Sequence, residues 1–165
     1  MGDTMTDPTT ERDLTIAPVV DADLPELLPL LRAYCDFYQV APGDTALDAL
    51  ARALLADPER EGLQLLARDG AGRAVGFATL FWTWQTLSAG RIGMMNDLYV
   101  APEARGAGVA GGLIDACLER CREHGATELI WQTARDNARA QALYDRIGAT
   151  RDDRWLDYSL PADGA

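Results

Sequence analysis

The sequence predicts an α/β protein in which a mixed sheet is flanked by helices. Segments with strand-like alternation and segments with helical spacing follow one another in the order β-α-α-β-β-β-α-β-α-β. This order is neither strictly alternating nor segregated, which favours a sheet containing both parallel and antiparallel pairs. The length of 165 residues and the apolar share of 48% fit one globular domain with its own core. We therefore expect a single domain over residues 12–163, preceded by a disordered, polar tail over residues 1–11.

Hydrophobic periodicity, helix caps and turn residues set the expected elements. The predicted strands cover residues 14–19, 63–68, 74–86, 92–100, 129–133 and 155–160. The predicted helices run from a cap at Asp21 or Asp23 to about Tyr38, from a cap at Asp44 or Thr45 to the residue before Pro58, from Gly108 to about Glu123, and from a cap at Asn137 to Ile147.

Charge and hydropathy bound the partners of the chain. The 15 basic and 26 acidic residues give a net charge of −11, which repels a phosphate backbone and argues against a nucleic-acid partner. The same charge attracts cationic amines, although solubility alone also accounts for it. The sequence has neither a run of 18 apolar residues nor a secretory h-region, so we expect no membrane partner and a cytoplasmic location.

The cysteines Cys35, Cys117 and Cys121 show no metal-ligand spacing. Cys117 and Cys121 share one face of a predicted helix. Two interpretations of the pair are open: zinc ligands, or small side chains buried in the core. Because His124 is the single histidine, we favour burial and expect no metal.

A turn of small residues follows the predicted strand 92–100 and opens a helix. Small residues let a ligand approach the backbone, and the first N–H groups of a helix form an anion site that suits a diphosphate. Residues 106–111 also match the GxGxxG pattern of dinucleotide-binding proteins, so a Rossmann-type oxidoreductase is an alternative interpretation. Against it, residues 102–105 separate strand and glycine, the acidic residues near 123–128 precede the next strand, and only 55 residues follow Ala110.

Two motifs in order resemble a known family. Arg105-x-x-Gly108-x-Ala110 follows a strand ending in Leu98-Tyr99-Val100, and further on Asn137 precedes a helix with Tyr144. Together they resemble the GCN5-related N-acetyltransferases, the GNAT superfamily, over roughly residues 74–160. The nearest likeness is to the branch of Hpa2-type and polyamine acetyltransferases. The resemblance implies a GNAT fold, with about six to seven strands and four helices, acetyl-CoA as cofactor, and a homodimer.

The resemblance also implies which residues bind the cofactor. Backbone groups of Leu98, Tyr99 and Val100 would pair with the pantetheine arm as an added strand. Asn137 would bond the cofactor arm, and it serves equally well as a helix N-cap. The N–H groups that would hold the pyrophosphate belong to Arg105, Gly106, Ala107, Gly108, Val109 and Ala110.

The implied reaction is direct attack of an amine on a thioester. Tyr144 would protonate the leaving thiolate, and Leu98 or Tyr99, beside the bulge typical of the family's fourth strand, would supply an N–H to the developing oxyanion. The resemblance assigns the base less directly. The polyamine-acetylating relatives have a glutamate beside an aspartate on the corresponding strand, whereas this chain has Asn96-Asp97. Asp97 is the first choice, with a structural role equally open. The alternatives are Asp36 and Glu26, and another branch has its base where this chain has Gln132.

Aromatic side chains near acidic ones suggest a site for a small cationic or amino-acid-like amine. The candidate substrate contacts are Tyr34, Tyr38, Trp82, Trp84 and Asn96. Packing in the sheet core or at a dimer interface also accounts for the aromatic residues. The absence of the glutamate at Asn96 keeps a second function open, that of an acyl-CoA-binding sensor without turnover.

Overall fold

The computed structural model describes residues 14–162, so the tail predicted over residues 1–11 lies outside the described residues. The chain forms two compact units, of which the first ends at Gln132 and the second begins at Thr133. Each unit is described by itself. None of the helices in the described range is both long and apolar enough to cross a lipid bilayer.

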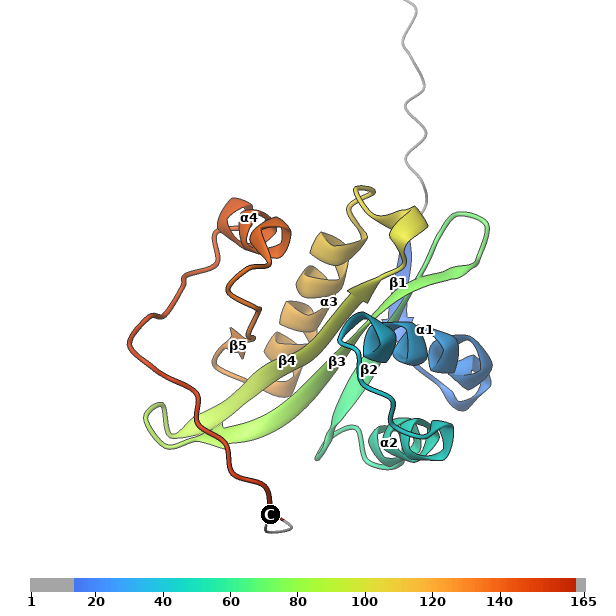
Figure 1. The fold of residues 1–165 in the computed structure, drawn as a ribbon. Helices are drawn as coiled ribbons and strands as arrows, with labels where there is room; N and C mark the ends of the chain where they lie inside the picture. The colour runs from blue at the N-terminus through green and yellow to red at the C-terminus, as the bar shows by residue number, and fades with distance from the viewer. Residues whose placement is uncertain (1–13, 163–165) are drawn as a thin grey trace, which may run out of the picture. The chain divides into compact units, whose positions relative to one another are not determined.

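The first unit contains one mixed sheet of five strands in the order β1-β2-β3-β4-β5 (Figure 1). Its strands are β1 (Thr15–Pro18), β2 (Gly62–Arg68), β3 (Ala74–Gln85), β4 (Gly90–Val100) and β5 (Leu129–Ile130). The pairs β1–β2, β2–β3 and β3–β4 are antiparallel, and β4–β5 is parallel. The mixed sheet is confirmed, and a Rossmann sheet, which is parallel throughout, is excluded.

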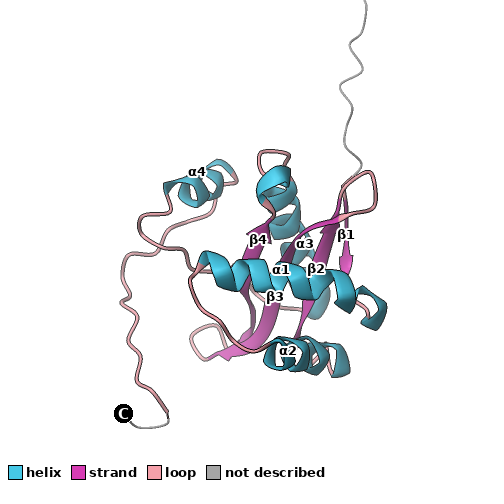
Figure 2. Cartoon of the chain, turned by 45° about the vertical axis from the view of Figure 1, so that its right-hand side comes forward, coloured by secondary structure: helices cyan, strands magenta, loops and turns pink. Residues whose placement is uncertain are grey.

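Helices cover both faces of this sheet. Helices α1 (Leu24–Phe37) and α2 (Asp44–Ala56) lie over one face, and α3 (Val109–His124) lies over the other (Figures 1 and 2). Short 3-10 turns precede α1 (Asp21–Asp23) and follow β4 (Pro102–Ala104). Phe77 packs in the core formed with α1, whereas a side chain at neighbouring Gly76 would meet Val109 and Leu113 of α3. Successive side chains of β3 therefore point alternately to the α1 face and to the α3 face of the sheet.

The cap predicted for the second helix is wrong. Helix α2 begins at Asp44 itself, with Gly43 as its N-cap, so neither Asp44 nor Thr45 occupies the cap position. Instead the Asp44 carboxylate pairs with the guanidinium of Arg32 on α1. A carboxylate in the first turn still complements the helix dipole.

The second unit contains α4 (Ala138–Arg146), and Asn137 is its N-cap, as predicted. The Asn137 side chain accepts a hydrogen bond of 3.2 Å from the Ala140 N–H. The strand predicted over residues 155–160 is wrong, because this segment has no regular structure and its apolar side chains are exposed. A strand needs a partner as well as alternation, and the described residues of the second unit contain no strand. The sheet therefore has five strands rather than six to seven.

The close approach of α3 to β3 depends on the missing side chain of Gly76. A Cβ atom there would lie 2.7 Å from the Tyr99 carbonyl oxygen and 3.3 Å from the Val109 side chain. We expect Gly76→Ala to lower the free energy of unfolding by about 1–3 kcal/mol, because the sheet and the start of α3 must separate.

Urea unfolding measures this change, with Gly111→Ala on α3 as the matched control. A Cβ at Gly111 would meet nothing within 4 Å, and alanine favours a helix by up to about 1 kcal/mol over glycine. Equal effects of the two substitutions would contradict the role of Gly76.

Candidate active site

Strand β4 contains a bulge at Asn96. Asp97 lies opposite Thr79 and Met95 lies opposite Leu80, so Asn96 has no opposing residue on β3. A bulge reverses the alternation of a strand. Met95 therefore faces α3, whereas Asp97 faces α1. The expected bulge is present, and it turns Asp97 to the other face of the sheet.

One edge of β4 is open beyond the bulge. Strand β5 pairs with β4 only at Gly93 and Met94, so the described residues offer no partner strand from Met95 to Val100 on that side. The Val100 carbonyl points to this edge, because it accepts a bond of 3.0 Å from Arg105 Nε. The Ala101 N–H points the other way, to the Val75 carbonyl on β3.

Alternation then assigns the backbone groups between these two points. Leu98 and Val100 present their N–H and C=O groups to the open edge, and Tyr99 directs its own to β3. Of the two oxyanion donors named from the sequence, the Leu98 N–H is the one on the open edge. Tyr99 is buried, with its ring in the core beside Phe77.

The turn after β4 is built from left-handed glycines. Gly106 has φ +84° and Gly108 has φ +81°, and a Cβ at either position would meet nothing within 4 Å. Helix α3 begins at Val109, and its first helical bond runs from the Gly112 N–H to the Gly108 carbonyl, 3.0 Å. The N–H groups from Val109 to Gly111 consequently have no acceptor within the helix, and no side chain caps them. Such a helix start, with open space beside its glycines, suits an anion.

Asp97 accepts hydrogen bonds from three neutral donors. These are the hydroxyls of Tyr34 and Thr79 and the amide of Asn96, the last at 3.0 Å. No arginine forms an ion pair with Asp97 in the part of the chain that the structure describes. Burial raises the pKa of the Asp97 carboxyl, and the three hydrogen bonds oppose that rise.

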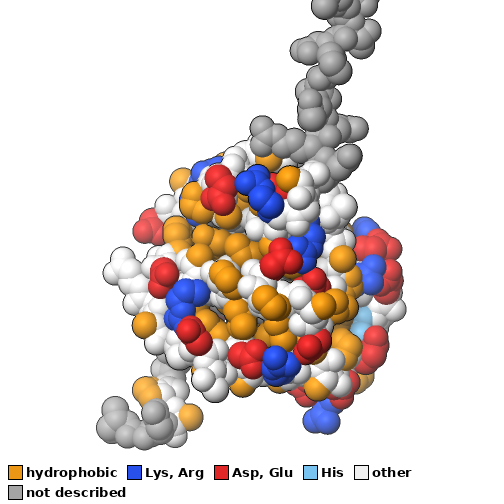
Figure 3. Space-filling model, turned by 90° about the vertical axis from the view of Figure 1, so that its right-hand side faces the viewer, with side chains coloured by type: hydrophobic (Ala, Val, Ile, Leu, Met, Phe, Trp, Pro, Cys, Tyr) orange, Lys and Arg blue, Asp and Glu red, His pale blue; other side chains and the backbone are white. Residues whose placement is uncertain are grey.

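Tyr34 and Tyr38 lie on the same face as Asp97. The Tyr34 ring contacts Tyr38 edge to face, with centroids 5.1 Å apart, and also Phe77. Burial first, and the charge of Asp97 second, raise the pKa of Tyr34, so its hydroxyl remains protonated and a fixed donor. Figure 3 turns the right-hand side of Figure 1, which holds α1 and α2, to the viewer and shows hydrophobic side chains gathered between scattered charged groups.

Trp82 and Trp84 lie on the other face of the sheet and do not join Asp97. Trp82 is buried, stacks on His124 with centroids 4.0 Å apart, and donates its indole N–H to the Pro58 carbonyl at 2.9 Å. Trp84 is 71% exposed, with the Arg91 guanidinium over its ring. This placement favours a packing role for Trp82 over a substrate contact.

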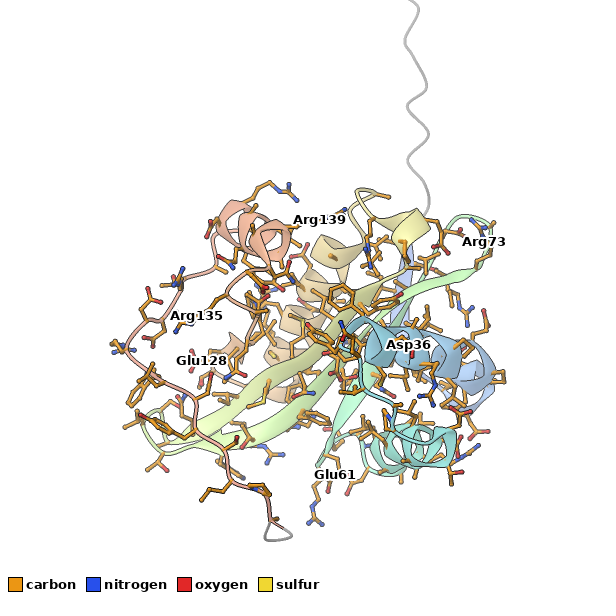
Figure 4. The ribbon with its side chains drawn as sticks, viewed as in Figure 1. Asp36, Glu61, Arg73, Glu128, Arg135 and Arg139 are labelled. Atoms are coloured by element: carbon orange, nitrogen blue, oxygen red, sulfur yellow. The ribbon has the colours of Figure 1, made fainter. Side chains whose placement is uncertain are left out.

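The other candidate bases differ from Asp97 in their surroundings. Glu26 pairs with Arg68 at 2.6 Å, and this hydrogen bond lowers the pKa of the Glu26 carboxyl. Asp36 is exposed on α1 (Figure 4). Asp97 differs from both, because it is half-buried and burial raises the pKa of its carboxyl, which is the condition that suits a base near neutral pH.

The remaining predicted residues lie in the second unit or on α3. Asn137 and the half-buried Tyr144 belong to the second unit, so their roles stay predictions. Cys117 and Cys121 are buried on α3, and burial raises the pKa of their thiols to about 12 and about 11. Thiols of this kind are unreactive, which fits the packing role expected for them.

Sequence reasoning missed two residues, Gln64 on β2 and Thr79 on β3. Both are buried, and Gln64 Nε2 donates to Thr79 Oγ1 at 3.2 Å. The available signal was a polar residue in the middle of each of two otherwise apolar strands.

The fold is that of an N-acetyltransferase. The solved structure of the aminoglycoside N-acetyltransferase AAC(6')-Iy in complex with CoA superposes with a TM-score of 0.79 at 20% identity, covering 90% of this chain and 95% of that one. The sequence matches the acetyltransferase (GNAT) family over residues 27–149. The chain therefore belongs to the GNAT family, as the two motifs predicted.

Two curated relatives support this assignment. The uncharacterized N-acetyltransferase YhfO of Bacillus subtilis is 31% identical over 89% of this chain and 97% of its own length. The D-amino-acid N-acetyltransferase HPA3 of Saccharomyces cerevisiae is 34% identical over 68% of this chain and 70% of its own length. The chain is thus similar to N-acetyltransferases over most of its length, and it is an acyltransferase.

The contacts of Trp82 predict a structural effect of its replacement. Trp82→Phe removes the bond to the Pro58 carbonyl and leaves a gap beside His124. We expect the free energy of unfolding to fall by about 1–3 kcal/mol. The matched control, Trp84→Phe at an exposed site on the same strand face, should change it by less than about 0.5 kcal/mol. Urea unfolding of both variants measures the difference, and a stable Trp82→Phe protein with weakened amine binding would instead favour the substrate role.

Proposed function

We propose that this protein transfers the acetyl group of acetyl-CoA to the primary amine of a small cationic or amino-acid-like substrate, by direct attack in a ternary complex. One observation carries the proposal. The open edge of β4, with the N–H groups of Leu98 and Val100, leads through a short 3-10 turn and two glycines into a helix start whose N–H groups have no acceptor within the helix. An extended thioester arm that ends in a diphosphate matches this sequence of groups.

The cofactor would be held mainly by backbone. Leu98 and Val100 would pair with the pantetheine arm as a neighbouring strand does. The N–H groups from Gly106 to Ala110 would receive the pyrophosphate, beside the Arg105 guanidinium. The room beside Gly106 and Gly108 fits this use, since among the described residues nothing lies within 4 Å of the place that a Cβ would take.

The reaction requires a neutral amine. At pH 7 about one alkylamine in a thousand is neutral, so a base must take a proton from its nitrogen. The nitrogen then forms a bond to the thioester carbon while the carbon–sulfur bond breaks, and it releases a second proton to water as the amide forms, which balances the proton that the thiolate takes up. In this proposal Asp97 takes the proton through a water, the Leu98 N–H stabilises the developing oxyanion, and Tyr144 returns a proton to the thiolate sulfur.

The hydrogen bonding of Asp97 is compatible with this task. A carboxylate offers about four acceptor positions, and three donors leave about one for a water. Its raised pKa brings its proton affinity closer to that of a base working near neutral pH. Tyr34 is unsuited to the same role, because its proton is held against the carboxylate.

The acceptor is proposed on charge and likeness. The net charge of −11 and the tyrosines beside Asp97 favour an ammonium-bearing substrate. The name of the yeast relative specifies D-amino acids, which carry such an amine. Amino acids of both hands and polyamines are therefore the first compounds to test.

Release of free thiol from acetyl-CoA, in the presence of a panel of amines, tests the proposal. The chain contains no lysine, so acetylation of its own lysine side chains cannot produce a background. Saturable, amine-dependent release is expected. Saturable binding of acetyl-CoA with no release for any amine would favour the sensor instead, and binding of a nicotinamide dinucleotide without affinity for CoA would overturn the proposal.

Replacement of Tyr144 tests its role as the acid. We expect Tyr144→Phe to lower kcat by about 10²–10⁴-fold, because the thiolate must leave without a positioned proton. Affinity for acetyl-CoA, measured by calorimetry, should stay nearly unchanged. Tyr158→Phe, at a 90% exposed position of the same unit, is the matched control and should retain the original kcat. An unaltered kcat in Tyr144→Phe would contradict the assigned role.

A further inference from the structure

Gln64 and Thr79 are the two buried polar residues of the described chain, with 3% and 0% of their surface exposed. They lie in register across the sheet, since Gln64 is opposite Thr79 on β3 and Thr79 is opposite Asp97 on β4. Three neighbouring strands thus each place a polar side chain in one row, on the face that packs against α1.

The hydrogen bonds along this row have a fixed direction. Gln64 Nε2 donates to Thr79 Oγ1 at 3.2 Å, so the threonine oxygen is already an acceptor. A hydroxyl has a single proton, and that of Thr79 is left for the Asp97 carboxylate, which lies opposite Thr79 in the sheet and whose pKa the hydroxyl lowers. The row is therefore a chain of donors that ends on Asp97.

Such a chain is costly in a sheet core. A buried polar group loses its water, and apolar residues of the same shape are often tolerated in its place. Valine has the shape of threonine and would pack at position 79 without needing a partner. Packing alone therefore does not explain why the row is polar. Its hydrogen bonds act on the Asp97 carboxylate, the group at the end of the row.

We propose that Gln64 and Thr79 are positioning residues of the acetyl-transfer site, which orient the Asp97 carboxylate and stabilise its ionised form. This inference rests on the proposed role of Asp97 as the base. Thr79 acts directly on the carboxylate. Gln64 acts through Thr79, because a hydroxyl that accepts a hydrogen bond becomes a better donor.

The surroundings of Asp97 leave this task to neutral donors. Tyr34 of α1 is the titratable side chain that bonds Asp97 within the first unit, and Tyr38, Cys35 and Tyr99 lie around Tyr34. No arginine forms an ion pair with Asp97 among the described residues. Burial raises the pKa of Asp97, and the Thr79 hydroxyl is the strongest of the hydrogen bonds that oppose this rise.

The pH dependence of kcat/KM, measured with one amine throughout, tests the inference. The base must be ionised, so the rate falls as the pH drops through its pKa. Thr79→Val removes a donor to the ionised form and should move this acidic limb to higher pH by about one unit. Thr79→Ser, which keeps the hydroxyl, should return the limb to its original position.

Thr83→Val is the matched control, on the same strand and the same face, and should leave the acidic limb unmoved. Gln64→Met should move the limb in the same direction as Thr79→Val but by less. Because every variant is assayed with the same amine, ionisation of the amine contributes equally to all profiles.

Titration of the Asp97 carboxyl by NMR, assigned by comparison with Asp97→Asn, gives a reading that needs no turnover. It should show the same shift in Thr79→Val. If Asp97→Asn abolishes turnover while Thr79→Val leaves both the limb and the titration unmoved, the inference is overturned and the proposed base stands. If Asp97→Asn keeps the original profile, the proposed base is wrong and the inference falls with it.

Discussion

Asn96 is inserted into β4 without an opposing residue on β3, and this bulge reverses the alternation of the strand from that point on. Before it, the Gly93 N–H bonds to the Glu128 carbonyl, toward the β5 side, and the Met95 side chain faces α3. After it, Leu98 and Val100 direct their backbone groups to that side, and Asp97 faces α1. In a regular strand Asp97 would share the face of Met95 and could not reach Tyr34. A single extra residue thus decides which backbone groups of β4 face the open edge and on which face of the sheet the carboxylate lies.

The turn after β4 and the start of α3 offer an anion site on a chain that is acidic overall. A protein with net charge −11 gains nothing from its overall field when a diphosphate approaches. The groups that would receive it are local. They include the first N–H groups of α3, which have no acceptor within the helix, and the left-handed glycines, which carry no Cβ. They also include the Arg105 guanidinium, which is held beside the turn by its bond to the Val100 carbonyl. The long-range charge remains available for a cationic acceptor, so the proposed cofactor and the proposed amine would be favoured by different parts of the electrostatics.

Most of the fold followed from the sequence, because strong periodicity and glycine turns mark β2, β3, β4 and α3 unambiguously. The failures have physical reasons. Residues 155–160 alternate as a strand does, but alternation describes one segment, whereas a strand needs a partner. The cap of α2 lies one residue before the predicted positions, at Gly43, and the Asp44 carboxylate pairs with Arg32 instead.

The site was predictable to a lesser extent. Motifs indicated the turn from Arg105 to Ala110, since its function lies in the backbone. The row of Gln64, Thr79 and Asp97 was out of reach, because its members are far apart in the chain and only strand register brings them together. Trp82 lies on the face of the sheet opposite to Asp97 for the same reason. The sequence of β3 alone does not show which of its two faces packs against α3, because this depends on the whole sheet.

Two carboxylates on the α1 side of this unit show how the environment sets the role of an acidic group. Glu26 pairs with the guanidinium of Arg68, and its pKa is lowered. Asp97 is bonded by hydroxyls and an amide, and burial raises its pKa. An arginine beside Asp97 would neutralise the charge that attracts an ammonium group and would weaken the carboxylate as a proton acceptor. Neutral donors also favour the ionised carboxylate, but they leave its charge in place and lower its proton affinity less than an ion pair does. The polar row can therefore hold Asp97 in place while its charge and most of its proton affinity stay available for the proposed role as the base.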